Sequence, residues 1–184
     1  MKTLAYILMA AGLSWTGTVK EDITVEADKH PVSVCLRGDD IRYQDLLTRD
    51  DLLRYLPIDS SSLTVKIAPF YSEYGWVCYE WKSNRPDREM ELWGERIRIP
   101  DINRVTLKFL QFDLLKKVDS TGYRQFDNLG DRSYWRWDRS QGIELIVEVG
   151  AARFTIETNV DAAQDSDLEK AVYFARQVLA KCIP

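Results

Sequence analysis

Alternating apolar and polar positions are the clearest pattern in the second half of the chain. Residues 143–149 and 153–158 each alternate, and a short turn containing Gly150 separates them. Two alternating runs joined by a short loop with a glycine are typical of a β-hairpin. We therefore predict two neighbouring antiparallel strands here.

Further apolar runs predict additional strands upstream of this hairpin. Residues 75–81 are apolar or aromatic at nearly every position, which is typical of a central strand covered on both faces. One or two short strands are expected within residues 17–36, a short helix at 113–118 and a loop at 120–128. The remaining predicted strands are 63–68, 92–99, 105–110 and the short aromatic run 134–137.

Apolar residues at helical spacing predict a long helix near the end of the chain. Its N-cap is expected at Ser166, because Glu169 follows three residues later as in a capping box. A shorter helix is predicted from Thr48 to Leu56, with Asp51 completing a similar start and Pro57 ending it. The apolar positions of the long helix are Leu168, Ala171, Val172, Ala175, Val178, Leu179 and Cys182.

These elements predict an α+β fold. We expect an antiparallel sheet of about five to seven strands, packed against the carboxy-terminal helix and the shorter helix. The chain has 184 residues with 45% hydrophobic and 29% charged side chains, a balance that supports one globular core and not a disordered chain. Residues 15–184 are predicted to be a single domain.

Residues 1–14 are typical of a secretory signal peptide. Lys2 precedes the apolar run 4–11, and small residues such as Gly12 follow it. The run is shorter than the roughly 20 residues of a membrane-spanning helix. This predicts a periplasmic or secreted protein that does not span the membrane after signal removal. The alternative is a buried first helix in a cytoplasmic protein.

Cys35, Cys78 and Cys182 are disulfide candidates if the chain is exported. We predict a bond between Cys35 and Cys78, worth about 4 kcal/mol in the chain-entropy model. The alternative is three reduced, buried thiols. None of the cysteines has the spacing of a metal site.

The sequence favours no catalytic chemistry, and we predict no catalytic residue, metal or cofactor. His30 is the single histidine and stands beside Pro31 in a predicted turn, where nothing marks a nucleophile. Glu144, Glu148 and Glu157 are predicted to share one sheet face, where paired acids can cleave glycosidic bonds, although alternation alone predicts solvent-facing positions. The net charge of −4 argues against nucleic acid as a partner.

Aromatic and arginine side chains alternate just before the predicted hairpin. Such a segment can stack on a sugar or anchor a protein partner, or its aromatic rings can complete the core. Trp135 and Trp137 share one strand face, and Arg136 takes the other. We name as a candidate interaction patch Arg132, Tyr134, Trp135, Arg136 and Trp137.

Three short motifs carry a resemblance to a known group of proteins. They are the segment 46–48 (Leu-Leu-Thr), the segment 78–81 (Cys-Tyr-Glu-Trp) and the segment 129–135, which contains Gly130-Asp131. In this order they resemble small exported bacterial domains and lipoproteins of unknown function, which carry a Gly-Asp-x-Ala-Tyr signature; Ser133 stands here at the alanine position. The resemblance implies an antiparallel sheet with helices on one side, and it brings no catalytic residues.

These observations together predict a non-catalytic, exported bacterial protein. We expect it to bind a protein or glycan partner in the cell envelope. Two alternatives stay open at this point. One is an inhibitor or immunity-type protein that neutralises a partner enzyme, and the other is a hydrolase acting on peptidoglycan or another glycan.

Overall fold

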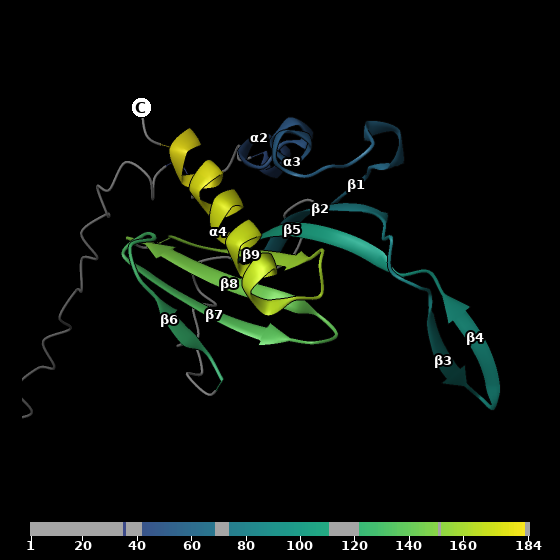
Figure 1. Cartoon of the computed structure of the whole chain (residues 1–184). Helices are drawn as coiled ribbons and strands as arrows, with labels where there is room; N and C mark the ends of the chain where they lie inside the picture. The colour runs from purple at the N-terminus through teal and green to yellow at the C-terminus, as the bar shows by residue number, and fades with distance from the viewer. Residues whose placement is uncertain (1–34, 36–41, 69–73, 111–121, 151, 183–184) are drawn as a thin grey trace, which may run out of the picture.

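A seven-stranded antiparallel sheet forms the body of the protein in a computed structural model that describes residues 35, 42–68, 74–110, 122–150 and 152–182 (Figure 1). This confirms the predicted antiparallel sheet. In spatial order its strands are β1 (Thr64–Ala68), β2 (Tyr74–Lys82), β5 (Ile102–Leu110), β9 (Ala152–Asn159), β8 (Gly142–Val149), β7 (Arg132–Asp138) and β6 (Arg124–Phe126).

The predicted carboxy-terminal helix is α4 (Gln164–Lys181), which crosses one face of the sheet over β8 and β9 (Figure 1). Its apolar face is buried against alternate residues of these strands, and the residues between them, most of which are polar, form the opposite sheet face. The shorter helix is α3 (Arg49–Tyr55), preceded by α2 (Tyr43–Leu46) and followed by the 3₁₀ turn η1 (Ser60–Ser62). The α+β fold is therefore confirmed. Fully buried at its centre are Leu145, Val147, Phe154, Ile156, Phe174, Ala175 and Val178.

The predicted hairpin is confirmed as β8 and β9, where Leu145 pairs with Ile156. Both residues face α4, and burying side chains of this size typically contributes about 1.5–3 kcal/mol each. The strand predicted at 75–81 is β2, an interior strand between β1 and β5. Its apolar composition agrees with burial on both faces, since Val77, Tyr79 and Trp81 are buried in the core and Cys78 is buried on the opposite face.

The two helix starts follow different rules. Thr48 caps α3 as predicted, since its Oγ1 accepts from the Asp51 N–H while Asp51 Oδ2 accepts from the Thr48 N–H at 2.8 Å. The prediction that Ser166 caps α4 is wrong, because the helix begins at Gln164 and Ala163 occupies the N-cap position. The buried Asp167 carboxylate instead accepts the N–H groups of two residues that precede the helix, each at 3.0 Å.

Two predicted segments differ in detail. Residues 120–128, predicted as a loop, include the short edge strand β6. Residues 92–99, predicted as one strand, belong to a hairpin of β3 (Arg88–Leu92) and β4 (Glu95–Ile99). Trp93 and Gly94 form its turn with φ angles of 50° and 83°, the positive values that a tight type I′ hairpin turn requires.

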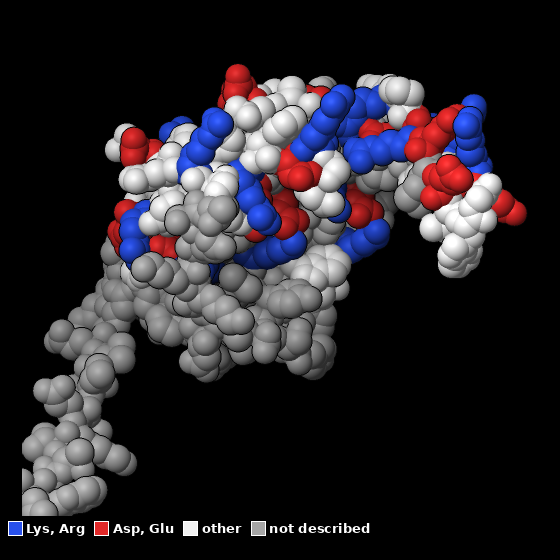
Figure 2. Space-filling model, turned by 90° about the horizontal axis from the view of Figure 1, so that it is seen from below, with Lys and Arg blue, Asp and Glu red and all other residues white. Residues whose placement is uncertain are grey.

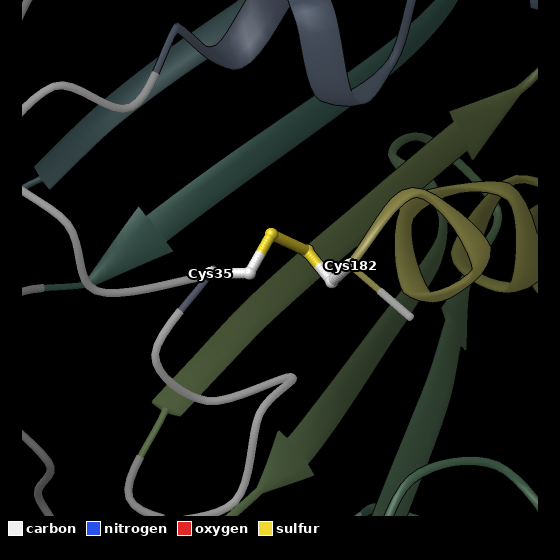
Figure 3. The surroundings of a disulfide bond; sticks show 2 residues. All are labelled: Cys35 and Cys182. Atoms are coloured by element: carbon white, nitrogen blue, oxygen red, sulfur yellow. A yellow bond between two sulfur atoms is a disulfide. The ribbon is translucent and has the colours of Figure 1, made fainter. Parts of the chain in front are cut away.

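The disulfide joins Cys35 to Cys182 at the end of α4, so the predicted bond between Cys35 and Cys78 is wrong (Figure 3). Cys78 is a free, buried thiol. Its neighbours Val77 and Tyr79 face the core, so strand alternation turns Cys78 to the opposite sheet face, away from α4. There its sulfur accepts a hydrogen bond from the Thr106 hydroxyl at 3.2 Å.

Several predictions fall outside the described residues. These are the signal peptide at 1–14, the strands within 17–36, His30 and the helix at 113–118. In the part of the chain that the structure describes, no helix has the length and apolarity needed to cross a membrane.

Candidate functional site

A separate two-stranded sheet projects from one end of the main sheet (Figure 1). It consists of β3, the turn at Trp93–Gly94 and β4, and we call residues 88–99 the arm. β2 leads into the arm and β5 leaves it, so both of its ends continue into strands that are themselves paired with each other. The arm is thus an outgrowth of the β2–β5 connection.

The register of the arm sorts its side chains onto two faces. One face carries two cross-strand pairs of opposite charge, Glu89 with Arg98 and Glu91 with Arg96. The other face carries Leu92, Ile97 and Ile99 together with Arg88 and Glu95; of its apolar residues, Leu92 and Ile99 are exposed and Ile97 is partly buried. The arm is therefore amphipathic, and its apolar side is open to solvent over much of its length.

Trp93 at the tip of the arm is the most exposed large hydrophobic residue of the described chain, with 96% of its surface accessible. Tryptophan is normally well buried, and it is enriched at the centres of protein–protein interfaces. Leu92, Ile99 and Ile102, at 40%, 38% and 39% accessible, extend apolar exposure from the tip to the start of β5. Clustered exposure of this kind indicates a contact surface.

A buried carboxylate fixes the base of the arm. The Asp101 side chain is only 3% exposed and accepts hydrogen bonds from Arg85 and from Arg88 Nε, the latter at 2.8 Å. Arg85 also donates to Asn103 Oδ1 at 3.1 Å and to Asn159 Oδ1 at 3.4 Å, which ties the approach to the arm to β5 and β9. These contacts hold the ends of the arm against the main sheet.

The electrostatics of Asp101 match this anchoring role. Burial alone would raise its pKa, but hydrogen bonds from Ser83 and Arg85 and the positive charge of Arg85 outweigh burial. The pKa of Asp101 is consequently lower than that of an ordinary aspartate. The carboxylate is therefore ionised at neutral pH and is available to both arginines.

The structure divides the predicted aromatic–arginine patch between the two faces of β7. Trp135 is buried in the core on the side of α4, and Trp137 is partly buried against the same core. Arg132, Tyr134 and Arg136 lie on the opposite face, because residues alternate along the strand. The five residues therefore do not form one continuous surface.

The three glutamates do share the sheet face that lies opposite α4, where each is bound by a basic side chain. Arg136 contacts Glu144, Lys108 contacts Glu157, and Arg153 contacts Glu148, which also lies 3.0 Å from Arg132 Nε. In Figure 2 positive and negative side chains lie beside one another over the described surface and along the arm. This arrangement is one of ion pairs across strands and assigns the glutamates a structural role.

A tyrosine completes the ion pair around Glu144. The Tyr123 hydroxyl donates to Glu144 Oε2 at 2.8 Å, and Arg136 lies 5.0 Å from the centre of the Tyr123 ring. Burial, reinforced by this hydrogen bond to an anion, raises the pKa of Tyr123 above its ordinary value. The phenol therefore stays neutral and acts as a hydrogen-bond donor.

Comparisons with known proteins add no relative. The chain matches no family model, and no curated protein or solved structure matches it. Within the described ranges, no group of three or more histidine, cysteine, aspartate or glutamate residues is arranged to hold a metal ion. The candidate site is therefore the arm, on geometric grounds alone.

The arm is not predicted from the sequence, because the strand expected at residues 92–99 includes Trp93. A usable signal is present, since Gly94 lies between two segments that each alternate charged and apolar residues. A glycine in that position predicts a hairpin turn, which would have placed Trp93 at an exposed tip.

Proposed function

We propose that the protein is a non-catalytic, exported binding protein of the bacterial cell envelope, and that the arm is its contact with a protein partner. The observation that carries this proposal is the position of Trp93, whose side chain is almost fully exposed at the tip of an anchored hairpin. Aromatic side chains contribute the largest binding energies when a partner buries them, because they remove a large apolar area from water.

Anchoring of the arm supports a binding role. Arg85 and Arg88 hold the base through Asp101 in the free protein, so less conformational freedom is lost when a partner is bound. The exposed apolar face and the neutralised charged face also differ from each other, which gives a partner a defined side to recognise. An arm with these properties is suited to docking.

Export is supported by two independent features. The pattern of residues 1–14 is typical of a signal peptide. The Cys35–Cys182 disulfide is of the kind that persists in oxidising compartments such as the periplasm and the extracellular space.

An inhibitor or immunity-type protein is the second candidate. The projecting tip with Leu92 and Trp93 favours it, because a narrow anchored hairpin can enter the cleft of a partner enzyme. In this alternative the same arm makes the contact, and the partner is an enzyme whose activity falls on binding.

Site-specific crosslinking tests the proposal. A photoreactive phenylalanine analogue is placed at position 93, crosslinked partners from the producing cell are identified by mass spectrometry, and the purified partner is titrated with Trp93→Ala. We expect affinity to fall at least tenfold, as for the loss of an interface anchor. Arg176→Ala, an exposed residue on α4 and outside the arm, is the control and retains affinity. Equal affinity of Trp93→Ala and the original chain would refute the role of the arm.

A further inference from the structure

The arm has the structure of an incomplete sheet. In the described chain, β3 and β4 pair only with each other, so each has one outer edge with unpaired backbone groups. A two-stranded hairpin is only marginally stable in water, and an exposed strand edge is a template for a further strand. A partner that adds a strand would satisfy backbone groups and cover apolar surface in one step.

The edge of β4 has the clearer chemical pattern. Arg96 and Arg98 lie on one face of this strand, and the β-branched residues Ile97 and Ile99 lie on the other. The Arg98 side chain is 77% exposed and lies 3.6 Å from Glu89, so it keeps surface for a second anion. A strand placed beside β4 therefore meets two cations on one face, and two apolar side chains beside Glu95 on the other.

We infer that the arm, if it binds as proposed above, accepts on β4 a strand of a different protein in which acidic and apolar residues alternate. Opposite charges directly across two strands stabilise their pairing, as do apolar pairs on the other face. The added strand would place its acids opposite Arg96 and Arg98, and its apolar residues opposite Ile97 and Ile99.

A two-fold dimer of this chain does not fit the edge. In a two-fold antiparallel pairing of β4 with itself that sets Ile97 opposite Ile97 or Ile99, arginine also stands opposite arginine. In a two-fold pairing of β3 with β3 of a second copy, Glu89 or Glu91 of one copy stands opposite a glutamate of the other. Like charges directly across strands destabilise the pairing, so the arm disfavours a two-fold dimer through either edge. β3 of a second copy would match the charges of β4, as β3 does within the arm, but this head-to-tail contact does not close and would build open chains of copies.

Anionic membranes and nucleic acids also fit poorly. The arm, residues 88–99, contains three acids and three arginines, and Glu91 and Glu95 each stand two residues from Trp93. Surfaces that bind phosphates or anionic headgroups carry an excess of basic residues close to the contact. The balanced charge of the arm instead matches the patterned surface of a protein strand.

Model peptides test the edge directly. One is a blocked peptide that alternates glutamate and valine, a second alternates lysine and valine, and a third is the first with alternate backbone nitrogens methylated. Binding to the full chain is followed by the anisotropy of a peptide label. We expect the glutamate peptide to bind at least tenfold more tightly than either of the others. Equal binding of the three peptides would overturn the inference.

A charge-swapped arm sharpens the test. The variant Glu89→Arg, Glu91→Arg, Arg96→Glu and Arg98→Glu keeps both cross-strand pairs of the arm but reverses the charge of β4. Its preference should invert toward the lysine peptide. An unchanged preference, self-association of the original chain through the arm, or binding to phosphatidylglycerol vesicles through Trp93 would each overturn the inference.

The crosslinked partner separates this inference from the proposed function. If Trp93→Ala lowers the affinity for the partner but the charge swap does not, the arm binds without adding a strand, and only the present inference fails. If Trp93→Ala leaves the partner's affinity unchanged, the proposed function fails as well. Binding reduced at least tenfold by both changes supports both proposals.

Discussion

The Lys181 ammonium at the end of α4 donates a hydrogen bond to Asp51 Oδ2 at the start of α3. The same carboxylate closes the capping box with Thr48, and the residue after Lys181 is Cys182, which is bonded to Cys35. An ion pair, a helix cap and a covalent bond therefore meet at one corner of the molecule. The carboxyl end of α4 is held there by contacts that act independently of its apolar face.

The first prediction concerns the covalent bond at this corner. Reducing the disulfide, or replacing Cys182 with serine, should lower the free energy of unfolding by up to about 5 kcal/mol, because the bond closes a loop across 147 positions. Urea unfolding with and without reductant measures the loss. Mass spectrometry of the unreduced protein should find one free thiol, at Cys78.

Cys78→Ala is the matched control for the disulfide. It removes the third thiol but leaves the Cys35–Cys182 bond, so the stability of this variant should still depend on reductant. If the stability of Cys78→Ala did not depend on reductant, this would contradict the Cys35–Cys182 pairing and would point to a bond that involves Cys78.

The second prediction concerns acid stability. Burial would raise the pKa of Asp51, but hydrogen bonds from Lys181 and Thr48 outweigh it, so the pKa is lowered, as it is for Asp101. A carboxyl whose pKa is lowered by folding stabilises the protein above its unfolded pKa, and this contribution is lost as pH falls toward the folded value. The unfolding free energy should therefore decline below about pH 4.

Urea unfolding at several pH values tests the assignment of this acid sensitivity. The double variant Asp51→Asn and Asp101→Asn should be less stable at pH 7 and should show a shallower decline below pH 4, because neither amide takes up a proton there. A decline as steep as that of the original chain would show that other carboxyls are responsible.

Most of the main sheet was predictable because one face of it is buried. Period-two alternation located β8, β9 and the core of β5, and helical spacing located α4, since burial on one side imposes these patterns on the sequence. The boundary of α4 was less accessible. Its start depends on Asp167 contacting N–H groups of the preceding loop, which is a tertiary arrangement that a local capping rule does not contain.

The disulfide and the arm were less predictable from the sequence than the main sheet, for two physical reasons. The disulfide depends on where each thiol lies relative to the sheet. Strand alternation places Cys78 on the face opposite α4, but it does not place Cys35. The arm has an exposed apolar face, so its residues do not obey the burial rule that located the other strands. Trp135 and Trp93 are the same residue type, and the local signal that separates them is the turn glycine, Gly94, that follows Trp93.

The third prediction contrasts these two tryptophans. Trp135→Ala removes a buried ring beneath Arg124, whose guanidinium lies 5.3 Å from the ring centre, and should cost about 3–5 kcal/mol of stability. Trp93→Ala removes an exposed ring and should change stability by less than about 0.5 kcal/mol. Chemical unfolding measures both. A large loss for Trp93→Ala would mean that the indole packs on the protein itself.

The last prediction concerns the anchor of the arm. Asp101→Asn keeps the size of the side chain but removes the charge that Arg85 and Arg88 share, and it should weaken the base of the arm by roughly 1–3 kcal/mol. Hydrogen exchange should therefore become at least tenfold faster in β3 and β4 and remain unchanged in β7 and β8, which lie on the far side of β9 from the arm. Glu89→Gln, which alters an exposed pair within the arm, is the matched control and should leave exchange nearly unchanged. Uniform acceleration across the whole sheet would contradict a local anchor and would show that Asp101 stabilises the entire fold.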